Sequence, residues 1–240
     1  MKIIDVFSPN FNRKKRSVNS IKVIIIHYTG MQSGRESLRR LINPKFKVSS
    51  HYLIYQNGKT LRLVKDNKIA WHAGKSCWGK CKNLNKYSIG IELINKGHLY
   101  GYESFKKKQL LSLIKVCKIL IKTYKIKKKN IVGHSDIAPL RKKDPGEKFP
   151  WIKLAKYKIG IWHNYKLNFL KKLRRVKISK KDRVEFFKNL ADIGYCLPSK
   201  KRNFFNKTVK AFQRHYRQEL VNGYLDKECL IIAQNLSKKL

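Results

Sequence analysis

The 240-residue sequence predicts an α/β fold followed by a small domain of three helices. Residues 21–28, IKVIIIHY, are a continuous β-branched run, which is typical of a strand buried on both faces of a sheet. Residues 103–124 repeat apolar side chains at helical spacing, as a helix packed on a sheet does. Near the C-terminus the pattern changes to three short helical segments. A chain of this length can hold one full core and a small second domain.

The first part of the chain reads as a strand, a short helix and a hairpin. After the strand at 21–28, residues 37–42 favour a short helix. Residues 50–64 contain two β-rich runs on either side of Asn57-Gly58. This pair readily adopts the positive φ angles of a type I′ turn, so we expect a β-hairpin here.

A later predicted strand carries a carboxylate in its interior. In residues 88–93, SIGIEL, the apolar side chains alternate with Ser88, Gly90 and Glu92. Glutamate is depleted within strands. Glu92 is therefore a candidate general base, and the alternative is an exposed charge on an edge strand.

The densest chemistry of the sequence follows another short apolar strand. Residues 133–150, GHSDIAPLRKKDPGEKFP, hold His134, Lys142 and Asp144. Pro145 disfavours the α region for Asp144, so Lys142 and Asp144 should point the same way along an extended segment. This arrangement suggests a metal ligand set with a cation beside it, although such a site needs further ligands from elsewhere. A surface Lys–Asp pair with a hydrogen-bonded histidine is the alternative.

Three aromatic side chains elsewhere are further candidates. His27 ends the strand at 21–28, where functional residues of α/β sheets gather. Its alternative role is a core histidine bonded to the backbone. Trp71 and His72 lie in a loop of Gly, Lys, Ser and Asn residues, where they can line a cleft. Trp71 can instead cover the core.

A stretch rich in Lys and Arg separates the two predicted domains. Apolar periodicity lapses between about residues 158 and 181. We expect a catalytic domain at 1–165, a linker at 166–180 and a helical domain at 181–240.

The three C-terminal helices have recognisable ends. The first spans residues 182–193 and stops at Gly194, a natural C-cap. The second takes Asn206 as its N-cap, and the third begins at Asp226. Their apolar side chains can form a small core of their own, and they contain no catalytic constellation.

The chain is strongly basic. Its 57 Lys and Arg against 14 Asp and Glu give a formal net charge of +43. Such a charge attracts any polyanion through a long-range, salt-sensitive interaction, but it does not identify which one. Because the lysines are spread over the whole chain, a compositional bias of the source genome is a serious alternative explanation.

The five cysteines cannot all pair, so we do not expect a disulfide framework. Cys77 and Cys81, with His72 nearby, form half of a possible structural zinc site. No second ligand pair follows at suitable spacing, which counts against this interpretation.

The sequence has no apolar run of the roughly 18–20 residues that a transmembrane helix needs. The first twenty residues lack the apolar segment and cleavage site of a secretory signal. We therefore expect either a cytoplasmic protein or one whose leader lies outside this numbering.

Taken together, these residues resemble a known enzyme family. His27 after a buried strand, Glu92 in SIGIEL, and His134, Lys142 and Asp144 in GHSDIAPLRKKDPG resemble the zinc-dependent N-acetylmuramoyl-L-alanine amidases of the amidase-2 family. The resemblance is strengthened by VSSHYLI at 48–54, WHAG at 71–74 and DPGEKFPW at 144–151. The tail resembles a peptidoglycan-binding module of three helices, most visibly in AFQRHYR and VNGYLD. The order of the two parts is similar to that of two-domain members.

The resemblance implies a mixed β-sheet flanked by helices and one zinc ion held by His27, His134 and Asp144. It also implies that Glu92 and Lys142 are catalytic. Two imidazoles and a carboxylate leave a fourth tetrahedral position for water, the pattern of a catalytic zinc site. In this chemistry Glu92 moves a proton from the water to the leaving amine, and Lys142 stabilises the oxyanion.

The predicted function on this resemblance is hydrolysis of the amide between N-acetylmuramic acid and the L-alanine of the stem peptide, in peptidoglycan or its turnover fragments. The residues assigned to substrate binding are Trp71, His72, Ala73 and His51. We expect peptidoglycan and muropeptides as partners, a monomer, and no specific nucleic acid. One alternative is a zinc-free recognition protein on the same fold. Another is a nucleic-acid-binding protein, which only the charge suggests.

Overall fold

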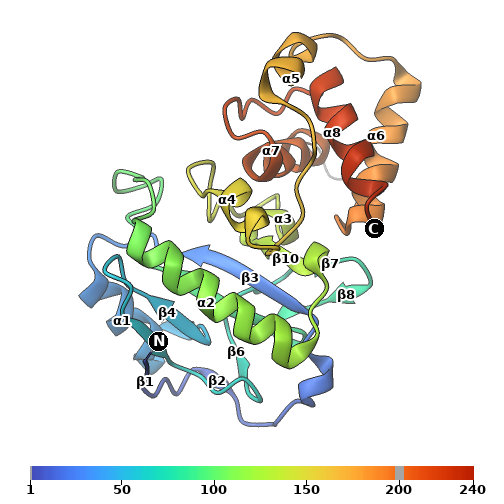
Figure 1. The fold of residues 1–240 in the computed structure, drawn as a ribbon. Coiled ribbons are helices and arrows are strands. Elements are labelled where there is room, and N and C mark those ends of the chain that lie inside the picture. Colours follow the sequence, from blue (N-terminus) through green and yellow to red (C-terminus); the bar gives the residue numbers. More distant parts are fainter. Residues whose placement is uncertain (1, 198–202) are drawn as a thin grey trace.

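The structure is a computed structural model that describes residues 2–197 and 203–240. Its centre is a six-stranded sheet in the order β1-β5-β4-β9-β3-β10 (Figure 1). Neighbouring strands are parallel except for the antiparallel pair β4 and β5, so the predicted mixed sheet is confirmed. The strands are β1 (Ile3–Asp5), β3 (Val23–Tyr28), β4 (Tyr52–Ile54), β5 (Thr60–Arg62), β9 (Ser88–Leu93) and β10 (Ile131–Gly133).

Short strands and helices complete the described part of the chain. Two small antiparallel pairs join β2 (Phe11–Asn12) to β6 (Ile69–Ala70) and β7 (Cys77–Trp78) to β8 (Cys81–Lys82). The α-helices are α1 (Gly34–Ile42), α2 (Lys107–Tyr124), α3 (His134–Ile137), α4 (Trp151–Lys156), α5 (Leu167–Leu173), α6 (Lys180–Ile193), α7 (Phe204–Tyr216) and α8 (Lys227–Ser237). Among the described residues, no helix combines the length and apolar character needed to cross a membrane.

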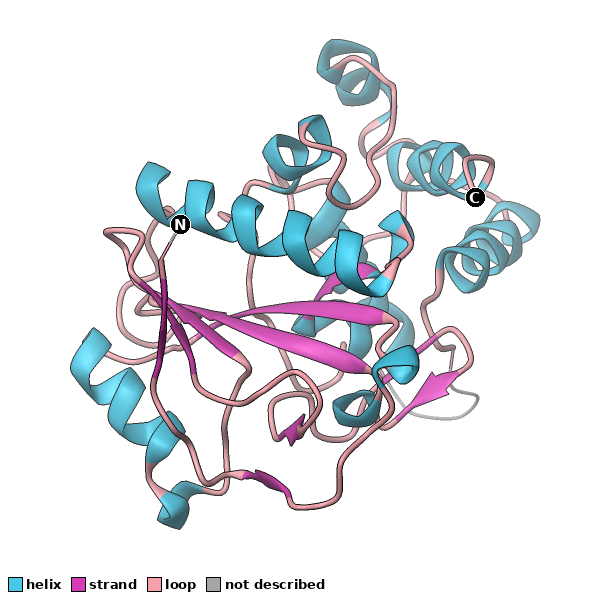
Figure 2. Cartoon of the chain, turned by 60° about the horizontal axis from the view of Figure 1, so that its bottom comes forward, coloured by secondary structure: helices cyan, strands magenta, loops and turns pink. Residues whose placement is uncertain are grey.

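The predicted long helix, α2, covers one face of the sheet (Figure 2). Its Leu113, Cys117 and Leu120 are buried in one apolar cluster with Ile24 of β3 and Ile91 of β9. Lys125 ends the helix in the left-handed conformation. The helical spacing of the apolar residues therefore predicted both the element and its buried face.

The opposite face of the sheet packs against the C-terminal helices. Val23 and Ile25 of β3 belong to the same continuous apolar cluster as Phe186 of α6, Phe212 of α7 and Leu230 of α8. The expectation that the three helices form a core of their own was wrong. They share one core with the sheet, because a strand buried on both faces needs an apolar partner on each side.

The predicted ends of the C-terminal helices are partly correct. Ser179 and Asp182 form a capping box at the start of α6, and Gly194 ends this helix at φ +137°. Asp226 caps α8 by accepting a hydrogen bond from the amide of Cys229. The N-cap prediction for α7 was wrong, because the helix begins at Phe204 and Asn206 lies inside it.

Asn206 has a tertiary role instead of the predicted cap. Its side-chain amide donates to the carbonyl of Gly223 at 3.2 Å.

The segment expected to be a linker contains a helix. Helix α5 lies within residues 166–180, and its Leu170 is buried in the core shared by the sheet and the C-terminal helices. Arg174, just after α5, donates from Nε to Glu228 Oε2 of α8 at 2.7 Å. The basic composition of the segment concealed this helix, since a single buried leucine is a weak periodic signal.

The hairpin at residues 50–64 is confirmed, but its turn differs from the expectation. Gly58 has φ +91°, whereas Asn57 does not adopt a positive φ. The amide of Gly58 donates to the carbonyl of Tyr55, and the amide of Tyr55 donates to the carbonyl of Lys59. This is a three-residue loop with a left-handed glycine, not a two-residue type I′ turn.

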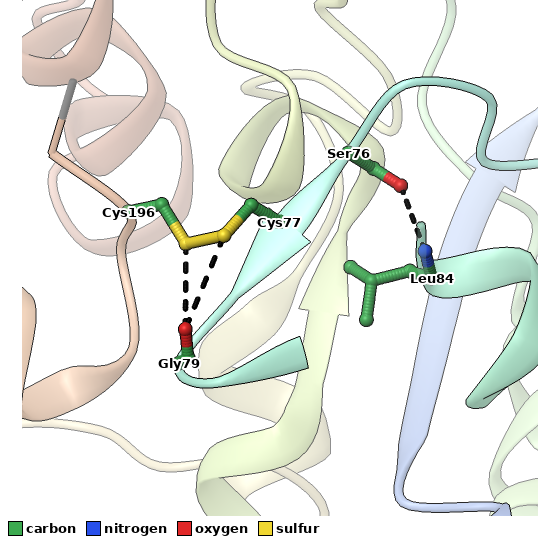
Figure 3. The surroundings of a disulfide bond; sticks show 5 residues. All are labelled: Ser76, Cys77, Gly79, Leu84 and Cys196. Carbon is green, nitrogen blue, oxygen red and sulfur yellow. Dashed lines mark hydrogen bonds between the residues drawn. A yellow bond between two sulfur atoms is a disulfide. The ribbon is translucent and has the colours of Figure 1, made fainter. Parts of the chain in front are cut away.

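A disulfide also joins the sheet domain to the C-terminal helical region. Cys77 of β7 forms a disulfide with Cys196, which follows α6 (Figure 3). Beside this disulfide, Trp78 pairs with Tyr195 as an isolated antiparallel bridge. The expectation of no disulfide framework missed this bond, and the alternative of a zinc site at Cys77 and Cys81 is excluded when Cys77 is oxidised.

We predict that Cys196→Ser lowers the free energy of unfolding by about 2–5 kcal/mol, because the disulfide closes a long loop that is otherwise free in the unfolded chain. Urea denaturation of the wild type and the variant, with and without a reductant, measures this difference. Cys81→Ser, which removes a free thiol, is the matched control and should change little. Alkylation of all five thiols in the unreduced protein unfolded in urea would contradict the bond.

Candidate metal centre and active site

Three side chains from distant parts of the chain converge at the carboxyl end of the sheet. His27 lies near the end of β3, His134 begins α3 directly after β10, and Asp144 follows in the next loop. The Nδ1 atoms of the two imidazoles are 2.9 Å apart. Asp144 Oδ2 lies 3.0 Å from His27 Nδ1 and 3.1 Å from His134 Nδ1.

Hydrogen bonding fixes which nitrogen of His134 faces this cluster. Its Nε2 lies 3.1 Å from the backbone carbonyl of Ala73, which can only accept a hydrogen bond. Nε2 therefore carries the hydrogen, and a neutral ring then presents a bare Nδ1. Arg141 donates to the same carbonyl from Nη2 at 2.7 Å and holds the Ala73 loop against the loop that carries Asp144.

The electrostatics favour the deprotonated forms of His27 and Asp144. Burial, together with the neighbouring His134, lowers the pKa of His27 to about 4. Burial alone would raise the pKa of Asp144, but His134 and His27 outweigh this effect and hold it below its usual range. Near neutral pH the cluster therefore offers a neutral imidazole and a carboxylate as electron-pair donors.

The residues present fit a zinc ion. All three donor atoms are buried and lie within 4.8 Å of one another. The lone pairs of these three atoms point towards one another, and they repel one another unless a cation or a proton lies between them. Two imidazole nitrogens and one carboxylate oxygen are a donor set that zinc prefers, with a position left open for water.

The cluster forms the floor of a cavity of about 660 Å³. The cavity is lined by His27, Tyr28, Thr29, Gly30, Met31, Ser37, Arg40, Leu41, Val48, His72, Glu92, His98, Leu99, Tyr100, His134, Arg141, Lys142, Lys143 and Asp144. Of the predicted catalytic residues, both Glu92 and Lys142 lie in this lining.

Glu92 sits in the strand next to His27. Strand β9 lies between β4 and β3, which excludes the alternative of an edge-strand charge, and Glu92 pairs in register with His27. Its Oε2 is buried with no hydrogen-bond partner. Burial and the neighbouring Asp144 raise the pKa of Glu92 to about 8. A carboxyl group with a raised pKa and a free oxygen is suited to proton transfer at neutral pH.

Comparison with known proteins identifies the family of this chain. Residues 17–147 match the N-acetylmuramoyl-L-alanine amidase family. The chain is 39% identical over 233 residues to the N-acetylmuramoyl-L-alanine amidase AmiD of Escherichia coli strain K12, covering 91% of this chain and 83% of that protein. It is 36% identical over 162 residues to the 1,6-anhydro-N-acetylmuramyl-L-alanine amidase AmpD of Haemophilus influenzae, covering 60% of this chain and 85% of that protein.

This chain belongs to the N-acetylmuramoyl-L-alanine amidase family.

Solved structures extend the similarity to both parts of this amidase. The complex of E. coli AmiD with anhydro-N-acetylmuramic acid-L-Ala-D-γ-Glu-L-Lys superposes with a TM-score of 0.82 at 35% identity and covers 95% of this chain and 92% of that chain. AmpDh3 of Pseudomonas aeruginosa gives a TM-score of 0.80 at 29% identity, covering 95% and 94%. The sequence therefore identified the enzyme class correctly.

Cationic side chains dominate the rim of the amidase cavity. Lys142 is half-buried beside the cluster, and Arg40 and Lys143 are exposed at the opening. Together with Arg141 they outnumber the two carboxylates of the lining, Glu92 and Asp144. The cavity therefore suits an anionic substrate.

Three of the four residues predicted to bind substrate do not line the cavity. Trp71 is half-buried and donates from Nε1 to Asn12 Oδ1 at 2.7 Å, and Ala73 contributes its carbonyl to His134. His51 is fully buried, with Nδ1 accepting from the amide of Gly90 at 3.0 Å. His72 does reach the cavity, although most of its ring is buried beside His27.

Sequence reasoning missed one polar chain at the cavity wall. The Tyr28 hydroxyl donates to His98 Nδ1 at 2.8 Å, and His98 Nε2 donates to Glu147 Oε1 at 3.2 Å. Glu147 also lies 3.8 Å from Arg214 Nε of α7. These residues come from four separate segments, and none carries a local pattern that predicts the contact.

We predict that Glu92→Gln stabilises the metal-free amidase above pH 8 by about 1–3 kcal/mol. A carboxyl whose pKa is raised on folding binds more protons in the folded state between about pH 4.5 and 8, so stability falls as the pH rises through this window. The gain from glutamine should therefore vanish at pH 4 and be complete above pH 8. Urea denaturation across this range tests the prediction.

The exposed Glu36 of α1 supplies the control for this pH profile. Glu36→Gln should show no comparable gain at high pH. A Glu92→Gln difference that does not change with pH would contradict the raised pKa.

Proposed function

We propose that this amidase uses one zinc ion, held by His27, His134 and Asp144, to hydrolyse the amide between N-acetylmuramic acid and the L-alanine of a stem peptide. The observation that carries the proposal is the convergence of Nδ1, Nδ1 and Oδ2 within about 3 Å of one another, with the unpaired Oε2 of Glu92 on the strand position that pairs with His27. When bound, the ion would supply Lewis-acid chemistry that activates water and polarises the amide carbonyl.

Glu92 moves the proton in this mechanism. Its carboxylate accepts a proton from the attacking water and delivers it to the nitrogen of the leaving L-alanine, while the C–N bond breaks. Without a metal ion, burial and Asp144 raise the pKa of Glu92 to about 8, so the carboxyl has the high proton affinity that suits the later transfer to the leaving nitrogen. A cation bound beside it would favour the carboxylate, which prepares Glu92 to act first as a base.

Lys142 stabilises the charge that develops on the substrate. Its side chain lines the cavity next to Asp144, where an ammonium can lie beside the oxyanion of the tetrahedral intermediate. Arg40 and Lys143 at the rim are placed to attract the carboxylates of the stem peptide. The ligand seen in the AmiD complex, a muramyl peptide with such carboxylates, supports this choice of substrate.

We predict that Glu92→Ala lowers kcat for cleavage of an anhydromuramyl tripeptide by about 10²–10⁴-fold, because the other carboxylate that lines the cavity in the described part of the chain, Asp144, is assigned to the metal. Lys142→Ala should lower kcat by about 10²-fold or more. Both variants should still bind one zinc ion per chain. Mass spectrometry of the released peptide measures the rates.

The matched control is Lys153→Ala, which removes an exposed lysine of α4 and should leave the rate unchanged. Zinc-loaded protein that binds the muramyl peptide without releasing the peptide would support a recognition protein instead of an enzyme. Wild-type rates in Glu92→Ala would remove Glu92 from the mechanism.

We also propose that residues 181–240 bind the wall and keep residues 1–165 close to their substrate, with 166–180 connecting them. Support comes from a second cavity of about 410 Å³ between residues 177–180 and the C-terminal helices, whose lining includes aromatic and basic side chains. Phe205 is 46% exposed there, and the guanidinium of Arg183 lies 5.1 Å from its ring centre. Exposed rings with neighbouring cations suit sugar faces and peptide carboxylates.

We predict that Phe205→Ala lowers the affinity for insoluble peptidoglycan by about 10-fold, because the exposed ring is lost from the cavity. Co-sedimentation with insoluble peptidoglycan measures this affinity. Hydrolysis of a soluble muramyl tripeptide should stay unchanged, because this cavity is separate from the metal centre. Val184→Ala, an exposed apolar residue of α6 outside the lining, is the control. Equal sedimentation of both variants and the wild type would contradict the assignment.

A further inference from the structure

The two metal-facing histidines have different partners on their outer ring nitrogens. His134 uses Nε2 to donate to the backbone carbonyl of Ala73. His27 Nε2 instead lies 3.0 Å from Nδ1 of another imidazole, His72. An imidazole nitrogen can donate or accept, so the contact alone does not decide which nitrogen of His27 carries its hydrogen.

The direction of this hydrogen bond is set by two further hydrogen bonds, from His72 to Ser88 and from Ser88 to the Leu84 carbonyl. The Ser88 hydroxyl lies 2.5 Å from the carbonyl of Leu84, which can only accept, so Ser88 uses its single hydrogen there. Ser88 Oγ is also 3.3 Å from His72 Nε2 and can only accept from it. His72 Nε2 therefore carries the hydrogen, and Nδ1 of the neutral ring is bare.

We propose that His72 is a positioning residue that fixes His27 in the tautomer able to bind the metal. Its bare Nδ1 accepts the hydrogen of His27 Nε2, which leaves His27 Nδ1 bare towards His134 and Asp144. The chain from the Leu84 carbonyl through Ser88 and His72 thus does for His27 what the Ala73 carbonyl does for His134. The inference rests on the proposed zinc site.

The surroundings hold the His72 ring in one place. The amides of His72 and Ala73 both donate to Asn85 Oδ1, at 3.1 and 2.7 Å. A Cβ atom at position 90 would collide with the His72 ring, so the glycine of SIGIEL leaves the space that this ring fills. The side chain of His72 is buried and cannot easily turn.

This role differs from substrate binding, which the sequence suggested for His72. A hydrogen-bond partner on the outer nitrogen of a ligating histidine fixes its ring orientation and tautomer. Loss of such a partner typically lowers metal affinity by about 10–100-fold. The effect should therefore appear in zinc binding itself, before any substrate is added.

Two substitutions at position 72 separate positioning from packing. His72→Leu removes the acceptor but fills much of the space. His72→Asn keeps an oxygen where Nδ1 now accepts, because the amide group of asparagine is shaped like that edge of the imidazole. Ser88→Ala removes the link that gives His72 its direction. His163→Leu, which replaces a half-buried histidine outside the cavity, is the control.

The measurements are the zinc dissociation constant by competition with a chromophoric chelator and the free energy of unfolding of each metal-free variant. Nitrogen-15 shifts of the histidine rings report the tautomer of His27. We expect His72→Leu to weaken zinc binding by about 10–100-fold and to lose the Nε2–H tautomer of His27. His72→Asn should stay within about 3-fold of the wild type, and Ser88→Ala should lie between the two.

Several results would overturn the inference. His72→Leu with wild-type zinc affinity would do so, as would His72→Asn binding zinc as weakly as His72→Leu. A change in affinity that only follows the loss of stability, with the His27 tautomer unchanged, would reduce His72 to a packing residue. Wild-type protein that binds no zinc would overturn both this inference and the proposed function. If the wild type binds zinc and hydrolyses the substrate, and the position 72 and Ser88 variants bind zinc as the wild type does, the inference fails while the proposed function stands.

Discussion

The parallel register of β3 with β9 and β10 is the constraint on which the active site depends. Because the three strands run in the same direction, their carboxyl ends meet at one edge of the sheet. The register pairs His27 with Glu92 and places Gly133, just before His134, beside Ile26. His27 and His134, more than a hundred positions apart, are therefore brought together by the pairing of their strands and not by the conformation of a long loop. A slip of one residue would turn His27 away from the cavity.

Much of this arrangement could be predicted from the sequence. Strand β3 is a β-branched run, β9 alternates, and each carries its polar residue near the same end, so His27 and Glu92 follow from local pattern. His134 and Asp144 lie ten residues apart in one short stretch after β10, and the resemblance to the amidases supplied their partner, His27. What local pattern could not give was the hydrogen-bond direction around each ring, because it depends on carbonyls such as that of Ala73.

Three of the errors share one physical cause, which is that the deciding contacts are distant in sequence. Cys77 and Cys196 are separated by 119 residues, and nothing near either cysteine indicates its partner. Helix α5 was missed because it is stabilised by burying Leu170 against other helices and not by its own periodicity. His51 was assigned to substrate by motif, whereas its backbone and ring belong to the sheet interior.

The C-terminal helices also affect the metal centre, because they contact the helical turn that carries His134. Asp136, in the same helical turn as His134, is a buried carboxylate that accepts from the amide of Gly133 at 2.8 Å. It also accepts from the Tyr195 hydroxyl at 2.6 Å and from His215 Nδ1 at 2.7 Å. A buried carboxylate is costly unless such donors satisfy it. The turn that presents His134 is therefore held partly by residues beyond 180, and the two parts of the chain act as one body at the site where the chemistry occurs.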